Sequence, residues 1–322
     1  MKTYLLPHTD LHITRLAYGC MSLAGWDSNP PTHVDRKRAA SMLETALELD
    51  INFFDTADIY GRGKCETVFG EALKQLSGAR DSLLIQTKCG IRFQDDPPGT
   101  PQRYDYSYEH IVASVEGSLR RLQTDHIDVL LLHRPDALVE PDEVARAFDE
   151  VQRAGKVRHF GVSNHSPMQM DLLKKSLKQP IVANQLEFNL LHGNLAELGI
   201  FINQLAAHYT AADGLLDYCR LNNILVQAWS PVAGGRLIDP PADAAPLVKA
   251  AAKAVAALAA AKHTSREAIA LGWILRHPAG IQPIVGTAKP ERLRLSAEAD
   301  QVEITREEWY TLLEAARGAT AP

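Results

Sequence analysis

The sequence lacks several features that would place it in common classes of protein. Its four cysteines, at positions 20, 65, 89 and 219, form no CxxC pair and no zinc-knuckle spacing. We therefore expect reduced, buried thiols in a cytoplasmic protein, and neither a disulfide framework nor a metal site. The segment MKTYLLPHTD has no apolar stretch typical of a secretory signal. The alanine-rich run 254–261 is far shorter than the ~20 residues of a membrane span.

The sequence also lacks an excess of positive charge and a dinucleotide-binding fingerprint. The 34 Lys and Arg residues against 39 Asp and Glu residues give a net charge of −5. No bulk positive field exists to hold nucleic acid or an anionic membrane, so local positive groups must bind any anionic ligand. Gly61-Arg62-Gly63 and Gly234-Gly235 do not have the GxGxxG spacing, which argues against a Rossmann site.

What is present is an alternation of short apolar runs and amphipathic helical stretches along 322 residues. The apolar runs predict eight strands at 16–18, 53–57, 83–88, 128–133, 159–163, 182–187, 225–230 and 283–286. The intervals between them are long enough for crossover helices, which parallel strands require. In two intervals, 111–122 and 144–151, apolar residues recur at helical spacing. We predict an α/β fold with one domain, a closed (β/α)8 TIM barrel that spans residues 1–322.

Four further segments lie outside this repeat. Residues 1–15 precede the first barrel strand and are predicted to form a hairpin plug. Residues 94–106, rich in Asp, Pro and Gly, and the partly helical excursion 189–214 are predicted as long loops at the C-terminal face. The segment 242–261 contains twelve alanines and predicts a helix on the solvent side.

Polar side chains follow the ends of consecutive predicted strands. Asp55 ends the second run with Tyr60 in the loop behind it, Lys88 ends the third and His133 the fourth. Side chains at the C-terminal ends of barrel strands converge on one pocket. Each residue also suits an ordinary role, Asp55 as a helix cap, Lys88 as a solvated strand end and His133 as a half-buried histidine. Four titratable types at one mouth nevertheless favour an active site, because packing does not require this arrangement.

Several longer motifs resemble landmarks of the aldo-keto reductase superfamily, in the same order. They are FFDTADIYGRGKCETVFGEAL (53–73), LLLHRPD (130–136), FGVSNH (160–165), NQLEFN (184–189), AWSPVAGGRL (228–237) and PIVGTAKPERL (283–293). Within the superfamily the sequence is most similar to bacterial YdhF-like oxidoreductases, and more remotely to potassium-channel β-subunits. The resemblance implies a (β/α)8 barrel that binds NADP(H) and reduces aldehydes or ketones.

The resemblance also implies a catalytic tetrad of Asp55, Tyr60, Lys88 and His133. Carbonyl reduction needs a proton for the developing alkoxide, and a phenol with a pKa near ~10 is a poor acid at neutral pH. A charged Lys88 favours the phenolate and lowers that pKa, while Asp55 keeps Lys88 charged and in position. His133 orients the substrate oxygen, and in the reverse reaction Tyr60 acts as the base.

The motifs imply a cofactor site along the later strand ends. Its residues are Ser163, Asn164, Gln185, Trp229, Ser230, Val232, Arg236, Gly286, Thr287, Lys289 and Arg292. Ser163, Asn164 and Gln185 would hold the carboxamide of the nicotinamide and Trp229 would stack on its ring, although Ser163 and Asn164 also suit a helix cap. Lys289 and Arg292 favour NADPH over NADH. Leu295 and Ser296 replace the Glu-Asn pair of other branches, which weakens the expected adenine contacts.

The substrate pocket and the choice of function are less determined. Trp26, Phe93, Tyr104 and His192 occupy loops expected at the mouth, either as a rim for a small aldehyde or ketone or as loop packing. Besides a reductase, the sequence leaves open an NADPH-binding regulatory or sensor subunit without significant turnover. A Schiff-base aldolase acting through Lys88 is the third alternative. No feature of the sequence indicates the oligomeric state.

Overall fold

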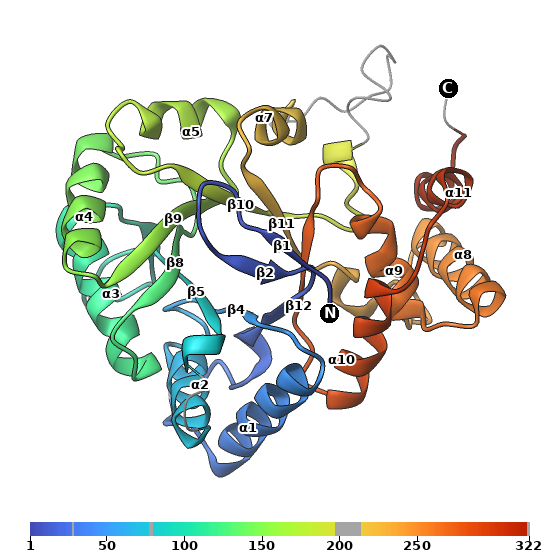
Figure 1. Ribbon diagram of the computed structural model, residues 1–322, viewed down its shortest axis with the longest axis horizontal. Coiled ribbons are helices and arrows are strands. Elements are labelled where there is room, and N and C mark those ends of the chain that lie inside the picture. Colours follow the sequence, from blue (N-terminus) through green and yellow to red (C-terminus); the bar gives the residue numbers. More distant parts are fainter. Residues whose placement is uncertain (28, 77–79, 197–213, 321–322) are drawn as a thin grey trace.

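Eight parallel strands close into a barrel in the computed structural model, which describes residues 1–27, 29–76, 80–196 and 214–320 (Figure 1). In chain order they are β3 (Ala17–Gly19), β4 (Phe53–Asp55), β5 (Leu84–Cys89), β8 (Ile127–Leu132), β9 (Val157–Ser163), β10 (Ile181–Glu187), β11 (Leu225–Trp229) and β12 (Gln282–Val285). β12 pairs with β3, where Ile284 faces Ala17, and this pairing closes the barrel. Each strand falls on a predicted apolar run, so the (β/α)8 prediction is confirmed.

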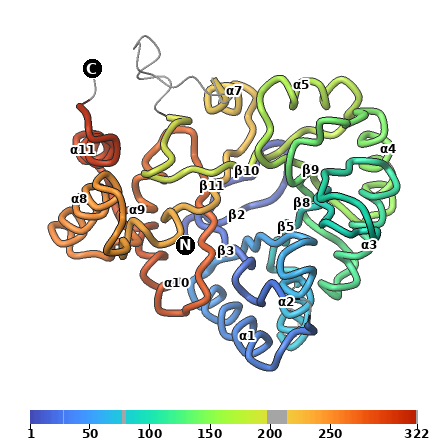
Figure 2. Tube along the Cα trace, turned by 180° about the vertical axis from the view of Figure 1, so that it is seen from behind, coloured from blue at the N-terminus to red at the C-terminus, as the bar shows by residue number. Residues whose placement is uncertain are grey.

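Helices surround the barrel, as Figures 1 and 2 show from opposite sides. Most connect successive strands, and the last two follow the final strand β12. The helices are α1 (His33–Glu48), α2 (Lys64–Gln75), α3 (Tyr108–Leu122), α4 (Pro141–Arg153), α5 (Pro167–Lys174), α7 (Leu215–Leu221), α8 (Pro246–Lys262), α9 (Arg266–Leu275), α10 (Pro290–Ala297) and α11 (Arg306–Arg317). Local sequence determines where several begin. At the start of α1, for example, Thr32 and Asp35 form a reciprocal capping box that satisfies backbone donors of the first turn.

The strands have two hydrophobic faces. On β8, Leu130 and Leu132 belong to the apolar layer between the strands and the helices. Val129 and Leu131 belong instead to a second cluster with Leu6 and Ile13, inside the barrel. This alternation follows from the two-residue period of a strand, and burial on both faces explains why the barrel strands read as apolar runs.

The N-terminal segment forms the predicted hairpin. β1 (Thr3–Leu5) pairs antiparallel with β2 (His12–Thr14). Figure 1 shows this dark-blue hairpin across the centre of the barrel. Leu6, Leu11 and Ile13 pack into the barrel interior, so the hairpin closes one end of the barrel and leaves the other end available for a ligand.

The other additional segments differ in how far the structure describes them. Two short strands, β6 (Ile91–Arg92) and β7 (Arg103–Tyr104), pair at the base of the predicted loop 94–106. The alanine-rich segment forms most of α8 on the outside of the barrel (Figure 1). Most of the excursion 189–214, namely residues 197–213, lies outside the described residues.

Two further sequence-based expectations bear on membranes and thiols. Among the helices that the structure describes, none has the length and apolarity required to cross a bilayer. Cys20, Cys65, Cys89 and Cys219 are all free and buried. Across the described ranges, His, Cys, Asp and Glu side chains form no group suited to hold a metal ion.

Candidate active site

Asp55, Tyr60 and Lys88 are in direct contact at the C-terminal ends of β4 and β5. The Lys88 Nζ donates to Asp55 Oδ1 at 2.8 Å and Oδ2 at 2.7 Å, and to the carbonyl of Thr56 at 2.8 Å. The same ammonium lies 3.2 Å from the Tyr60 hydroxyl. Lys88 is 0% exposed and Asp55 is 2% exposed, so the ion pair is removed from water. Sequence position alone had indicated only that these side chains share one mouth.

Burial and charge act in opposite directions on Lys88 and Tyr60. Burial would lower the pKa of Lys88, but the Asp55 carboxylate and the Tyr60 hydroxyl outweigh it, and the pKa is raised. Burial raises the pKa of Tyr60 above its ordinary value, and the Lys88 ammonium opposes this shift without cancelling it. The expected lowering of the Tyr60 pKa by Lys88 is therefore outweighed, because burial has the larger effect and the Asp55 charge also raises this pKa. At neutral pH Tyr60 is a protonated phenol that contacts a charged amine.

His133 follows β8 and faces Tyr60. Their ring centroids are 5.8 Å apart and the rings meet edge to face. Burial, the Lys88 charge and the Arg134 charge all hold the pKa of His133 well below its ordinary value, so the imidazole is neutral at physiological pH. Within the described residues its Nδ1 has no hydrogen-bond partner. A neutral imidazole beside a phenol suits the binding of a polar oxygen.

A chain of buried glutamine amides supports Asp55 from inside the barrel. Gln86 and Gln185 both donate to Asp55 Oδ1, at 2.6 and 2.8 Å. Gln86 also donates to Gln227, which donates to Gln282, each at 2.9 Å. Gln282 donates in turn to the carbonyl of Thr14, the last residue of β2 in the hairpin, at 2.7 Å. Gln86 and Gln185 therefore stabilise the negative charge of Asp55, and the rest of the chain fixes the orientation of these amides.

A second buried acidic group holds the loop that carries Tyr60. Glu66, 0% exposed at the start of α2, accepts from the Thr87 hydroxyl at 2.6 Å and from Arg121 at 2.7 Å. The backbone N–H of Asp58 donates to the Lys88 carbonyl at 3.1 Å. Burial and the nearby Glu66 charge raise the pKa of Asp58 to about 8. These contacts tie the Tyr60 loop to β5 and α3.

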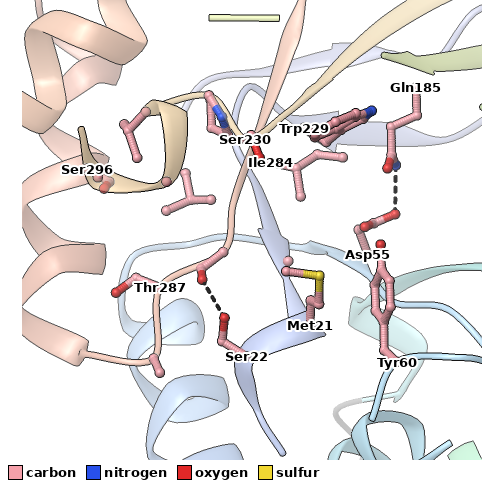
Figure 3. Close-up of a pocket in the computed structure, with 18 of the residues that line it drawn as sticks. Met21, Ser22, Asp55, Tyr60, Gln185, Trp229, Ser230, Ile284, Thr287 and Ser296 are labelled. Atoms are coloured by element: carbon pink, nitrogen blue, oxygen red, sulfur yellow. Dashed lines mark hydrogen bonds between the residues drawn. The ribbon is translucent and has the colours of Figure 1, made fainter. Parts of the chain in front are cut away.

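A cavity of about 700 Å³ opens above the tetrad, a size typical of sites for small ligands and cofactors. Asp55 and Tyr60 line one part of it, and Thr287 and Ser296 line another (Figure 3). His133 also lines the cavity. Ten of the eleven residues expected at the cofactor line the same cavity: Ser163, Asn164, Gln185, Trp229, Ser230, Val232, Gly286, Thr287, Lys289 and Arg292. The barrel therefore brings residues at or near the ends of six strands, β4, β8, β9, β10, β11 and β12, into one continuous space.

A network of hydrogen bonds holds the side chains of the cavity wall beside the tetrad. The Trp229 Nε1 donates to Asn164 Oδ1 at 3.2 Å, and Asn164 Nδ2 donates to Ser163 Oγ at 2.7 Å. Ser163 Oγ donates to the Gln185 carbonyl at 2.9 Å. Asn164 adopts a positive φ of 62°, which asparagine tolerates better than most residues. This network sets the plane of the Trp229 ring at the cavity surface.

The residues at the other end of the cavity suit a phosphorylated dinucleotide. A Cβ added at Gly286 would meet no atom within 4 Å, and the same is true of Gly234, so both expose bare backbone to the cavity. Lys289 is the N-cap of α10 and makes no side-chain capping bond. Pro290 has no N–H, and the N–H groups of Arg292 and Leu293 donate to the Lys289 carbonyl, so the Glu291 N–H is the donor of this turn that remains for an anion. Arg292 lies in that turn. Ser296 also lines the cavity, whereas its neighbour Leu295 is exposed.

Besides the fully buried Lys88, five predicted residues lie outside the lining of this cavity. Arg236 donates through its Nε to the Ala233 carbonyl at 3.0 Å. Trp26 meets the Tyr60 ring edge to face at 6.3 Å. Phe93 lies under the Arg62 guanidinium at 4.5 Å, Tyr104 lies on β7, and His192 pairs with Asn189 in a turn. Of the four predicted rim residues, Trp26 thus contacts a member of the tetrad, Tyr60.

Comparison with known proteins gives full-length matches. A sequence profile described as the Aldo/keto reductase family matches residues 15–317. Oxidoreductase YdhF of Escherichia coli is 36% identical over 96% of this chain and 95% of its own length. A 6-dehydroglucose reductase of Agrobacterium fabrum is 34% identical over 96% of each chain. A glycerol dehydrogenase from Gluconobacter oxydans has the same fold, with a TM-score of 0.81, 26% identity and coverage of 99% of this chain and 96% of its own.

Proposed function

The chain belongs to the Aldo/keto reductase family, as its motifs predicted, and from this premise we propose that it reduces aldehydes or ketones to alcohols with NADPH. The observation that carries the proposal is the contact of the buried Asp55–Lys88 ion pair with the Tyr60 hydroxyl at the base of the cavity. The similarity to 6-dehydroglucose reductases supports a carbonyl compound as the substrate.

The protein residues supply the proton and the orientation, and NADPH supplies the hydride when bound. Tyr60 is protonated at neutral pH and donates its proton to the oxygen that becomes the alkoxide. Lys88 stabilises the phenolate that remains, and Asp55 with its glutamine donors keeps the ammonium in place. The neutral His133 holds the carbonyl oxygen near Tyr60. In alcohol oxidation the same groups act in reverse, with Tyr60 as the base.

The geometry of Lys88 argues against the aldolase alternative. A Schiff-base lysine attacks as a neutral amine, so it needs a lowered pKa and a free electron pair. The pKa of Lys88 is raised, and its Nζ is engaged by Asp55, Thr56 and Tyr60. The tetrad also supports turnover over a purely regulatory role, since a sensor needs no buried proton donor.

A panel of aldehydes and ketones with NADPH tests the proposal directly. We expect loss of absorbance of the reduced nicotinamide with several carbonyl compounds and recovery of the matching alcohols. Tight NADPH binding with no turnover on any carbonyl would favour the sensor subunit. Substrate trapped on Lys88 by borohydride would favour the aldolase. Either result would contradict the proposed activity.

We further propose NADPH as the preferred cofactor, on the basis of Lys289 and Arg292. Arg292→Ala should weaken NADPH binding roughly 10- to 100-fold, the range for a lost charge-assisted hydrogen bond, and leave NADH binding nearly unchanged. Fluorescence titration of each cofactor measures both constants. Arg294→Ala is the matched control, because Arg294 lies on the same helix but pairs with Glu48 at the surface. Equal losses for NADPH and NADH would remove the assignment of Arg292 to the 2′-phosphate.

A further inference from the structure

Arg134 is a cation at the active-site cavity that the proposed mechanism does not use. It directly follows His133 and lines the same cavity as His133 and Tyr60. Its guanidinium carbon lies 5.7 Å from the centroid of the Trp229 ring. The side chain is half-buried. The cavity therefore contains a positive group beside the reacting centre, in addition to the buried Lys88.

The backbone of Arg134 is held by hydrogen bonds, whereas its guanidinium contacts only the Trp229 ring among the described residues. The Arg134 N–H donates to the Tyr106 hydroxyl at 3.0 Å, and the Arg134 carbonyl accepts from that hydroxyl. In the ranges that the structure describes, the guanidinium forms no hydrogen bond and no ion pair. The acid two residues on, Asp136, instead accepts from the backbone N–H groups of Tyr106 and Leu138.

The two buried carboxylates of the active-site region, Asp55 and Glu66, are likewise paired with groups other than Arg134. Asp55 is held by Lys88 and two glutamines, and Glu66 by Arg121 and Thr87. A half-buried charge is costly to desolvate without a counter-charge. The effect of Arg134 on the pKa of His133 also indicates that its charge is felt at the imidazole.

From this geometry we propose that Arg134 binds an anionic group of the carbonyl substrate, so that the enzyme prefers small aldehydes or ketones that carry a carboxylate or a phosphate. The inference rests on the proposed function and specifies its substrate class. A guanidinium offers a fork of N–H donors that matches both anions. A neutral polyhydroxylated substrate would satisfy the donors but leave the charge unpaired.

The proposal separates Arg134 from the cations assigned to the cofactor. Lys289 and Arg292 lie at α10, whereas Arg134 follows β8 beside His133. The anion bound by Arg134 therefore belongs to the molecule whose carbonyl meets Tyr60. Because both side chains line one cavity and the Arg134 charge acts on the His133 imidazole, the carbonyl and the anion fit within one small compound.

Matched pairs of aldehydes test this preference. 4-Oxobutanoate is compared with butanal, and phosphoglycolaldehyde with glycolaldehyde, by kcat/KM with NADPH. We expect the wild type to favour at least one anionic member about 10-fold or more. Arg134→Gln should bring that ratio close to one, Arg134→Lys should retain part of it, and the pair that responds identifies carboxylate or phosphate.

Two further measurements distinguish substrate recognition from a general defect. The control is Arg62→Gln, since Arg62 also stacks on an aromatic ring but is exposed and does not line the cavity. The ratio should be unchanged in this variant, and the Kd for NADPH should be unchanged in both. A preference for neutral members, or for glyceraldehyde over both anions, would overturn the proposal. Equal weakening of NADPH and of all substrates in Arg134→Gln would also overturn it.

The test remains decisive if the wild type reduces no carbonyl, which would defeat the proposed function. Sodium butanoate is then titrated calorimetrically into the wild type and into Arg134→Gln, with butanamide as the neutral probe. Binding of butanoate that requires Arg134 would support the anion site without turnover. Binding that is absent, or equal for butanoate and butanamide, would refute it.

Discussion

Tyr60→Phe is expected to abolish most carbonyl reduction while leaving NADPH binding intact. The substitution removes only the hydroxyl, so the ring and its edge-to-face contacts with Trp26 and His133 remain. Loss of a positioned proton donor typically costs about 10²–10⁴-fold in rate. We expect kcat to fall within this range in an assay of NADPH oxidation. The Kd for NADPH, measured by fluorescence, should change little because the hydroxyl contacts Lys88 and not the far end of the cavity.

Tyr4→Phe is the matched control for this prediction. Tyr4 lies on β1, and its hydroxyl is buried with no hydrogen-bond partner in the described part of the chain. Its removal should leave kcat unchanged. If Tyr60→Phe retained wild-type turnover, another group would have to donate the proton and the proposed mechanism would be wrong.

The sequence was sufficient to predict the barrel because its strands are buried on both faces. Continuous apolar runs marked each strand, and the polar residues within or at the ends of these runs marked the face of the barrel where the cavity opens. Asp55, Lys88 and His133 were recognisable on that rule alone, whereas Tyr60 required the loop motif. Distances were not predictable: a strand-end position indicates a shared mouth, but the 3.2 Å contact of Lys88 with Tyr60 depends on how the loop packs against β5.

The glutamine chain was missed although a signal existed. Gln86, Gln227 and Gln282 lie within or at the start of apolar strands, where a polar residue must find a buried partner. The partner is contributed by another strand in each case, and sequence does not specify it. Gln185 was assigned to the cofactor, but its amide nitrogen also donates to Asp55, as Figure 3 shows.

The relative effects of burial and charge on the Tyr60 pKa could not be predicted from the sequence either. The Lys88 charge does oppose the shift of the Tyr60 pKa, as expected, but burial has the larger effect. Desolvation depends on everything packed around a group, so a motif does not determine its magnitude. Arg134 was similarly visible within LLLHRPD, but its lack of a partner among the described residues is a property of the fold.

Lys88→Met should produce the largest combined loss of stability and activity. It leaves the Asp55 carboxylate, which is 2% exposed, without its counter-charge. Removal of one partner of a buried ion pair typically lowers stability by about 3–5 kcal/mol. The donors Gln86 and Gln185 remain, so we expect a loss near the lower end, about 3 kcal/mol, in the free energy of unfolding measured with urea. Turnover should fall at least as far as in Tyr60→Phe, because the phenolate loses its stabilising charge.

A double variant separates the structural role of the pair from its chemical role. Asp55→Asn with Lys88→Met removes both charges, so much of the lost stability should return while the protein stays inactive. Arg80→Met is the remote control. Arg80 pairs with the buried Asp128 at 2.9 Å, and neither residue lines the cavity, so this variant should lose stability but keep its kcat when folded. Recovery of turnover in the double variant would mean that the ammonium of Lys88 is not what makes Tyr60 an effective proton donor.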